Sequence, residues 1–433
     1  FIKYQKNMFD RFPSAGPLHW FNNSGLSKRD IFIYEDINLL EEKDKDEIQR
    51  KGFEHINLLE CSNFFISPFK SIKNYKRFFS DENFFKDLEF NTIKFFIIWK
   101  VGCYEKIFKT LNVKLLNQHQ EFSVNALSKY LALKNLNCVS FWSHWSSSNQ
   151  LSVHYYYSFV DIILSWGKLD TDYYRIHNTN FEKIFEVGVI YGDSLDYQKK
   201  SSFKKIMTKE IKICIFDTSH STNTIYVNTK LILKFYKKLF SFFEKKDNYK
   251  LYLKSKGSSF EKIKDDKEIN SLYKKMLLKE KIEIISPKIT PYDIARKSDL
   301  AISFDYNTAG IISGLSGVKS IFLNYSKLNK YPFHDTFKKN KISFDNFEEF
   351  EEFLGTNGIE NIKYFDQDTK TKIDKYQDNN ANLRSGEIIL KTFLLINDKK
   401  NPKNIFENLE EYFEQKWNLK NKNVSVNKKN LWA

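Results

Sequence analysis

The chain has 433 residues and a mass of 51.7 kDa, which favours two domains of about 200 residues over a single one. Hydrophobic residues make up 41% of the chain and aromatic residues 17%, which excludes a globally disordered protein. The net charge of +15 favours anionic partners such as phosphorylated metabolites, anionic polymers or anionic lipid, although an AT-rich genome also raises the Lys content. No apolar run is long enough to predict a membrane-spanning helix.

In the first part of the chain, short apolar runs alternate with longer amphipathic stretches. Such runs, without clean alternation of polar and apolar residues, are typical of strands buried on both faces of a parallel sheet. They predict strands at 30–34, 113–116, 138–142, 161–166 and 185–190, with a helix near 122–133.

A second series of the same kind begins at Lys212. It predicts strands at 212–216, 249–253, 282–285, 300–304 and 318–323, and a long helix carries apolar residues at helical spacing from Ile232 to Phe243. This repeated alternation predicts an α/β fold with two Rossmann-like domains facing each other across a cleft. We expect one domain at 1–200 and a second at 206–345, with the boundary near 197–209. The helices and basic tail of 346–433 are expected to pack back across that boundary.

Polar residues follow three strands of the second series, where parallel sheets bind their ligands. We expect these residues to bind a phosphate or another anion, since Lys side chains and a helix N-terminus both suit a phosphate. The residues are Lys254, Lys256, Ser219, Ser221, Asn307 and Thr308. The structural alternatives are an ordinary helix cap, a solvated lysine pair and a helix start that needs small residues only for packing.

Four residues are candidates for the chemical step. Asp217 ends the strand 212–216, where a carboxylate could stabilise an oxocarbenium-like state or attack it. Glu121, after the strand 113–116, could act as general base across the cleft from Asp217, and His144 and His220 are reserve candidates for the same proton. The structural alternative makes Asp217 a helix cap and Glu121 a surface charge, and Asp161, at a strand start, is interpreted as structural.

Several known signatures are absent. The sequence contains no GxxxxGK[ST] loop, no GxGxxG after a strand, no HExxH and no GxSxG. The histidines lack metal-ligand spacing, so no metal is predicted, and no nucleic-acid-binding motif accompanies the positive charge. The four cysteines form no CxxC pair and follow no signal peptide, which favours a reduced, cytoplasmic protein. The first residue is Phe1 rather than Met, so a longer parent protein stays open.

Three stretches resemble GT-B glycosyltransferases of bacterial surface-polysaccharide (capsule and lipopolysaccharide) biosynthesis. They are 113–167, with its strand, histidine loop and Asp-to-Gly strand; Leu251–Gly257, similar to the Lys-x-Lys donor-phosphate motif of Kdo-transferase-like enzymes; and 284–325, similar to the donor half. The chain departs from the family at Ser143-His144-Trp145, where relatives often have Gln-His-Gly, and at Ile312-Ser313-Gly314, where many place a Glu.

The resemblance implies metal-independent transfer of a sugar from a nucleotide sugar to a glycan or lipid-linked glycan, without a cofactor. It makes 1–200 the acceptor-binding domain and 206–345 the donor-binding domain, so that the six anion-binding candidates become the predicted donor-binding residues. A CMP-activated acidic sugar such as Kdo is favoured, because two Lys and a helix N-terminus would complement its phosphate and carboxylate. Peripheral contact with an anionic membrane at the inner face of the cell is compatible with the charge. Three alternatives stay open: a CDP-polyol phosphotransferase of the teichoic-acid type, a sugar-nucleotide 2-epimerase and a non-catalytic polyanion-binding module.

Overall fold

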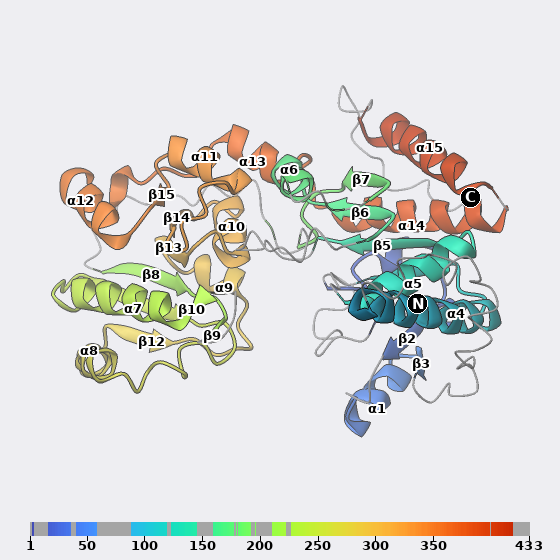
Figure 1. The fold of residues 1–433 in the computed structure, drawn as a ribbon. Helices are drawn as coiled ribbons and strands as arrows, with labels where there is room; N and C mark the ends of the chain where they lie inside the picture. The colour runs from blue at the N-terminus through green and yellow to red at the C-terminus, as the bar shows by residue number, and fades with distance from the viewer. Residues whose placement is uncertain are drawn as a thin grey trace.

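A computed structural model describes residues 2–3, 16–35, 40–58, 88–118, 123–144, 159–176, 179, 181–191, 195, 210–221, 227–398 and 400–418. These residues form two sheets of six or more parallel strands, which lie in separate halves of the molecule (Figure 1). The boundary expected near 197–209 lies outside the described residues. The predicted fold class, two Rossmann-like α/β units, is confirmed.

The first sheet has seven parallel strands in the order β3-β2-β1-β4-β5-β6-β7. Its strands are β1 (Ile2–Lys3), β2 (Phe32–Glu35), β3 (Glu54–Asn57), β4 (Leu115–Asn117), β5 (Val139–Ser143), β6 (Ile162–Ser165) and β7 (Lys183–Glu186). The helices of this half are η1 (Phe21–Asn23), η2 (Lys28–Asp30), α1 (Glu42–Arg50), α4 (Leu88–Thr110), α5 (Val124–Asn135) and α6 (Lys168–Ile176). Each strand predicted in this half overlaps an observed one, whereas β1 and β3 were not predicted.

The second sheet has six parallel strands in the order β12-β11-β8-β13-β14-β15. Its strands are β8 (Ile211–Phe216), β11 (Tyr249–Lys254), β12 (Ile282–Ile284), β13 (Leu300–Phe304), β14 (Lys319–Leu323) and β15 (Ser343–Phe344), and β9 (His220–Ser221) pairs with β10 (Val227–Asn228) beside it. The helices are α7 (Thr229–Glu244), α8 (Lys267–Leu278), α9 (Pro291–Ala295), α10 (Thr308–Leu315), α11 (Pro332–Lys339), α12 (Phe347–Asn357), η6 (Ile359–Asn361) and α13 (Gln367–Ile373).

The apolar spacing of the sequence explains the core of the second half. The predicted helix is α7, capped by the Asn228 side chain, which accepts a hydrogen bond from the Lys230 amide. Its buried residues pack against the apolar side chains of β8, β11 and β13. These residues are Ile232, Phe235, Tyr236, Leu239, Phe240 and Phe243. Burial of such a face is the main stabilising contribution to a helix in a globular protein.

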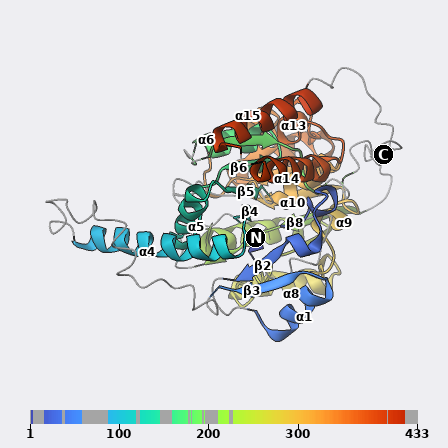
Figure 2. The same ribbon diagram turned by 90° about the vertical axis from the view of Figure 1, so that its right-hand side faces the viewer.

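The last helices return to the first sheet. α14 (Ala381–Asn397), α15 (Pro402–Phe413) and the π-turn η7 (Glu414–Asn418) follow the second half in sequence. These helices nevertheless lie beside the strands of the first sheet (Figures 1 and 2). Ile388, Leu409 and Phe413 share one core with Phe141 and Leu164 of that sheet. After β7 the chain therefore passes to the second half, and before α14 it returns to the first.

Several contacts join the two halves of the molecule. The ring centroids of Tyr173 on α6 and Tyr331 beside α11 lie 5.2 Å apart within a shared apolar cluster. In the second crossing, Arg384 is 1% exposed, its Nε donates to the Val187 carbonyl oxygen at 2.6 Å and its guanidinium pairs with Asp378. The crossing segment is thus fixed to the end of β7.

Candidate functional site

The order of the second sheet defines where a ligand would bind. β8 and β13 are neighbours at its centre, and the chain moves from β8 to one side of the sheet and from β13 to the other. Such a switch point leaves a crevice at the carboxyl ends of the two strands, where open α/β sheets bind ligands. The carboxyl ends of β8, β11 and β13 meet here: Lys254 is the last residue of β11, and the other predicted donor-binding residues follow the three strands.

Asp217 follows β8 directly, and its side chain is 4% exposed. Its Oδ1 accepts a hydrogen bond from the Lys256 amide at 2.6 Å, and its Oδ2 accepts from the hydroxyls of Ser255 at 2.7 Å and Tyr236 at 2.8 Å. Burial raises the pKa of the carboxyl, and these hydrogen bonds oppose the rise. Asp217 therefore connects the loop after β11 to the end of β8, and a part in chemistry stays a prediction.

His220 holds the same loop from a second point. Its Nε2 lies 3.0 Å from the Ser259 carbonyl oxygen and its Nδ1 lies 2.9 Å from the Thr229 hydroxyl. Because a carbonyl oxygen only accepts, Nε2 donates, which leaves Nδ1 to accept from Thr229 in the neutral ring. Ser259 in turn donates to the Thr218 carbonyl oxygen at 2.8 Å. Both ring nitrogens are engaged, so the predicted proton transfer by His220 would have to break one of these bonds.

The two predicted lysines differ in their surroundings. The Lys254 ammonium donates to the carbonyl oxygens of Ser286 at 3.1 Å and Pro287 at 3.2 Å, in the loop after β12. The Lys256 ammonium makes no hydrogen bond or ion pair with the residues that the structure describes. Desolvation lowers the pKa of Lys256, and the charge of Asp217 opposes this effect. Lys256 is thus the better placed of the two to meet an anion.

Asn307 is the N-cap of α10. Its Oδ1 accepts from the Gly310 amide at 2.9 Å, and its Nδ2 donates to the carbonyl oxygens of Phe304 at 3.0 Å and Phe216 at 3.3 Å. Both amide hydrogens are engaged, so an anion would reach the Asn307 side chain only by displacing one of these bonds. Thr308 is the first residue of α10, beside the helix N-terminus. Ser219 and Ser221 lie in the loop after β8, and Ser221 belongs to β9.

The glycines of α10 have a packing role. A Cβ at Gly310 would collide with Ser303 Oγ and lie 2.8 Å from the Phe322 ring, and one at Gly314 would collide with the Phe365 ring. Packing within the domain therefore accounts for the absence of a Cβ at these two positions, and binding of an anion by the start of α10 stays a prediction. The two glycines let α10 approach β13, β14 and the chain near Phe365.

Asp305 is fully buried immediately after β13, with a positive φ of 49°. Its Oδ1 accepts from the Ser326 amide at 3.1 Å, and its Oδ2 accepts from the Ser326 hydroxyl. Burial raises the pKa of Asp305 to about 7, and the bonds from Ser326 oppose the rise. The carboxyl therefore changes its charge near neutral pH, two residues before the N-cap of α10.

In the first half, the carboxyl edge of the sheet is described only in part. Glu121 lies outside the described residues, and so does its predicted position opposite Asp217. His144 follows β5 and is 1% exposed, with Nε2 3.0 Å from Asp170 Oδ1 and Nδ1 2.7 Å from the Tyr174 hydroxyl. Both ring nitrogens are engaged, so His144 could take up a proton from an acceptor only if one of these two contacts broke. Asp161 accepts hydrogen bonds from Ser140 and pairs with Lys134, in keeping with a structural role.

The sequence did not indicate three of the residues that shape the site. Ser255 and Ser259 lie in a Lys/Ser/Gly stretch that suggests a loop, and nothing in that stretch predicts their partners. Tyr236 was expected as a core residue of α7, and its buried hydroxyl bonded to Asp217 has no sequence signal.

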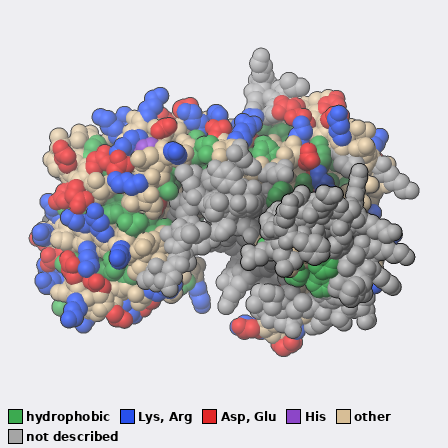
Figure 3. Space-filling model, viewed as in Figure 1, with side chains coloured by type: hydrophobic (Ala, Val, Ile, Leu, Met, Phe, Trp, Pro, Cys, Tyr) green, Lys and Arg blue, Asp and Glu red, His purple; other side chains and the backbone are tan. Residues whose placement is uncertain are grey.

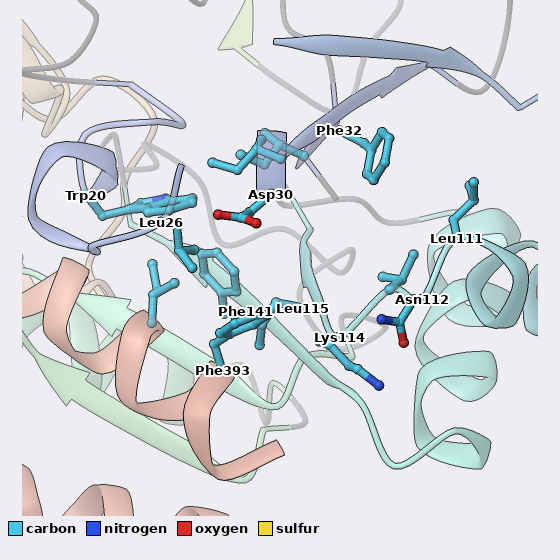
Figure 4. Close-up of a pocket in the computed structure, with 14 residues that line it drawn as sticks. Trp20, Leu26, Asp30, Phe32, Leu111, Asn112, Lys114, Leu115, Phe141 and Phe393 are labelled. Carbon is cyan, nitrogen blue, oxygen red and sulfur yellow. The ribbon is translucent and has the colours of Figure 1, made fainter. Parts of the chain in front are cut away.

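A separate cavity of about 70 Å³ lies at the amino ends of strands in the first sheet (Figure 4). It is lined mainly by apolar side chains near the starts of β2 and β4 and on α14, among them Trp20, Leu115 and Phe393, with Asp30 and Lys114 beside them. Because the amino ends of parallel strands face away from the ligand-binding crevice, we do not assign this cavity to the site.

Charge and metal-binding groups add little to the site. On the face shown in Figure 3, Lys and Arg side chains of the second half are interspersed with Asp and Glu rather than gathered in one patch. Among the described residues, no three His, Cys, Asp or Glu side chains come together as metal ligands. No helix in the described part of the chain is long and apolar enough to cross a membrane.

Comparison with solved structures shows a shared fold. MurG of Acinetobacter baumannii superposes with a TM-score of 0.51 at 10% identity, over 90% of this chain and 98% of that one. A UDP-GlcNAc 2-epimerase of Neisseria meningitidis, bound to UDP-GlcNAc, gives a TM-score of 0.42 at 10% identity, over 92% and 97% of the two chains. No curated protein sequence matches significantly.

The sequence profile of one protein family matches more than half of the chain. It covers residues 120–354, from the segment after β4 into α12, and thus includes the entire switch point of the second sheet. The family is described as "Polysaccharide biosynthesis PFTS motif protein". The chain therefore belongs to this family of polysaccharide biosynthesis proteins.

Proposed function

We propose that the protein is a glycosyltransferase that binds a nucleotide sugar at the carboxyl edge of the second sheet and transfers the sugar to a polysaccharide acceptor. The observation that carries the proposal is the switch point between β8 and β13. There, Lys256 and the N-terminus of α10 flank one strand end, in a chain from a polysaccharide biosynthesis family. Basic side chains and helix N-termini stabilise a leaving phosphate. The fold shared with MurG supports the same reading.

The proposed donor is a CMP-activated acidic sugar of the Kdo type, and the proposed acceptor is a glycan or lipid-linked glycan. Lys254, Lys256 and the first turn of α10 supply positive charge and N–H donors for one phosphate and one carboxylate. Glu121 is the proposed general base for the acceptor hydroxyl. Glu121→Gln keeps the shape of the side chain and removes its charge, so the transfer rate should fall about 100-fold. An unchanged rate would assign the proton to another group.

A nucleotide panel tests the donor site first. The folded protein is heated with CMP, CDP, UDP or GDP, since a ligand at about 100 times its dissociation constant stabilises the folded state by about 2.7 kcal/mol. CMP should give the largest shift in melting temperature. A shift with none of the four nucleotides would refute the proposal, and a larger shift with UDP or GDP would replace the donor.

Product analysis separates the remaining activities. A glycosidic product without transferred phosphorus supports the glycosyltransferase. A product that carries phosphorus from the donor indicates the CDP-polyol phosphotransferase, and conversion of UDP-GlcNAc without an acceptor indicates the epimerase. Polyanion binding without nucleotide binding indicates the non-catalytic module.

Peripheral contact with an anionic membrane is a further part of the proposal. The net charge of +15 supports it, because anionic lipid attracts basic surfaces. The protein should sediment with vesicles that contain anionic lipid and remain in the supernatant with neutral vesicles. Equal sedimentation with both would contradict electrostatic attachment.

A further inference from the structure

We propose that Asp217 is a positioning residue: it holds the loop Ser255–Phe260 in the shape that presents the Lys256 ammonium to the donor phosphate. The inference rests on the proposed function, because it names how that donor site is built. It also gives Asp217 a role other than the chemical one expected from the sequence.

The first step is the contact between Asp217 and the residue that it would position. Asp217 Oδ1 accepts directly from the Lys256 amide at 2.6 Å, so the carboxylate sets the backbone from which the ammonium projects. Oδ2 is bound by the hydroxyls of Ser255 and Tyr236. Tyr236 is a fully buried residue of the α7 core, which makes Asp217 a fixed anchor.

The second step is that the loop is held at both ends. Ser255 Oγ, which donates to Asp217, also accepts from the Phe260 amide at 2.8 Å. Ser259 is bound by Thr218 and His220, both from the loop after β8. Between these points the chain turns at Gly257, whose φ is +59°. Lys256 therefore projects from a loop whose shape is already held by its own hydrogen bonds before any ligand binds.

The third step places Lys256 relative to the helix N-terminus. Asn307, the N-cap of α10, donates to the carbonyl oxygen of Phe216, the residue before Asp217. β11 and β13 flank β8, and neighbouring strands lie about 4.8 Å apart, so the two groups bracket the end of β8 across about 10 Å. Phe216 and Asp217 therefore set the distance between Lys256 and the N-terminus of α10. These are the two positive sites that would bind one anionic group.

The fourth step concerns what the carboxylate itself can do. Its oxygens accept three hydrogen bonds, from the Lys256 amide at Oδ1 and from the Ser255 and Tyr236 hydroxyls at Oδ2, and the side chain is 4% exposed. A carboxylate exposed to the donor would repel the phosphate that Lys256 attracts. Because Asp217 is buried and bonded to these three groups, it supports the loop without contacting the donor.

The test measures nucleotide affinity by calorimetry, with whichever of CMP, CDP, UDP or GDP gives the largest thermal shift. Lys256→Ala should weaken binding about tenfold or more, because it removes a charge-assisted contact. Ser255→Ala, which opens the loop, should weaken binding several-fold in the wild-type background and less than twofold in the Lys256→Ala background. Residues that act through one another show this lack of additivity.

Three further variants keep the test informative. Asp217→Asn should stay within about threefold of wild-type affinity, because the amide oxygen still accepts from Lys256 and the amide nitrogen can donate to the two hydroxyls. Tyr236→Phe removes a single hydroxyl and replaces Ser255→Ala if that variant does not fold. Lys262→Ala removes an exposed charge two residues after the loop and should leave affinity unchanged.

Additive losses in the Ser255→Ala/Lys256→Ala pair would overturn the inference, and so would a loss in Asp217→Asn as large as that in Lys256→Ala. Failure of the proposed function looks different, because the wild-type protein itself would then bind no nucleotide.

Discussion

The raised pKa of Asp305 makes the stability of the protein depend on pH in an unusual direction. The unfolded carboxyl ionises near 3.8, whereas the buried one ionises at about 7. Between these values the unfolded chain loses its proton and the folded chain keeps it, so stability falls as pH rises from about 4 to 7 and then levels off. A difference of about three pH units corresponds to about 4 kcal/mol of unfolding free energy.

Asp305→Asn removes this dependence with little change in shape. The amide oxygen can accept from the Ser326 amide and the amide nitrogen can donate to the Ser326 hydroxyl, as the protonated carboxyl does. Asn also tolerates the positive φ of this position. The variant therefore copies the protonated state at every pH, and relative to wild type it should gain about 4 kcal/mol between pH 4 and pH 8.

Urea unfolding, followed by tryptophan fluorescence at half-unit steps from pH 4 to pH 8.5, measures the difference between the two proteins. Subtracting one curve from the other cancels the pH dependence that they share. Asp265→Asn, which removes an exposed carboxylate, provides the baseline for losing one negative charge. If the difference between wild type and Asp305→Asn changes by less than about 1 kcal/mol over this range, the reasoning about burial is wrong.

Three further changes test the site and the core. Lys254→Ala/Lys256→Ala should weaken nucleotide binding about tenfold or more in calorimetry while the far-ultraviolet circular dichroism stays unchanged; the exposed α8 pair Lys274→Ala/Lys275→Ala is the charge-matched control, and an equal loss there would point to a nonspecific effect. Gly310→Ala should lower the unfolding free energy by about 1–3 kcal/mol, because its Cβ would meet Ser303 and the Phe322 ring, and an unchanged urea midpoint would contradict this. Leu409→Ala should cost about 2–5 kcal/mol if α15 stabilises the first sheet, and unfolding at the wild-type midpoint would show that it does not.

The strands of the second sheet could be predicted because each is a compact apolar run followed by polar residues. Residues 213–216 of β8 and all of Leu300–Phe304 are buried, and Ser303 is the one polar residue among them. β3 could not be found in the same way, because Glu54–Asn57 contains only one apolar residue and lies at an edge of the sheet. Edge strands are buried on fewer sides, and their pattern is correspondingly weaker.

The site was predictable in position but not in the roles of its residues. Parallel strands bring their carboxyl ends together, so Asp217, Lys256 and Asn307 could be placed at one edge from their spacing alone. Which way a side chain faces depends on partners from distant parts of the chain. Asn307 bonds to Phe216, 91 residues away, and Asp217 bonds to Lys256, 39 residues away. The residues next to Asn307 and Asp217 in the sequence do not indicate these distant partners.

The return of α14 and α15 to the first sheet has a consequence for how the protein is made. The core of the first half needs Leu409 and Phe413, which leave the ribosome long after the strands that they cover. The second half, by contrast, is complete once the chain has been synthesised through α13. The second half can therefore fold first, while the apolar side chains of the first sheet stay exposed until α14 and α15 have been synthesised. A nascent chain of this design exposes hydrophobic surface for most of its synthesis, and that surface is what chaperones recognise.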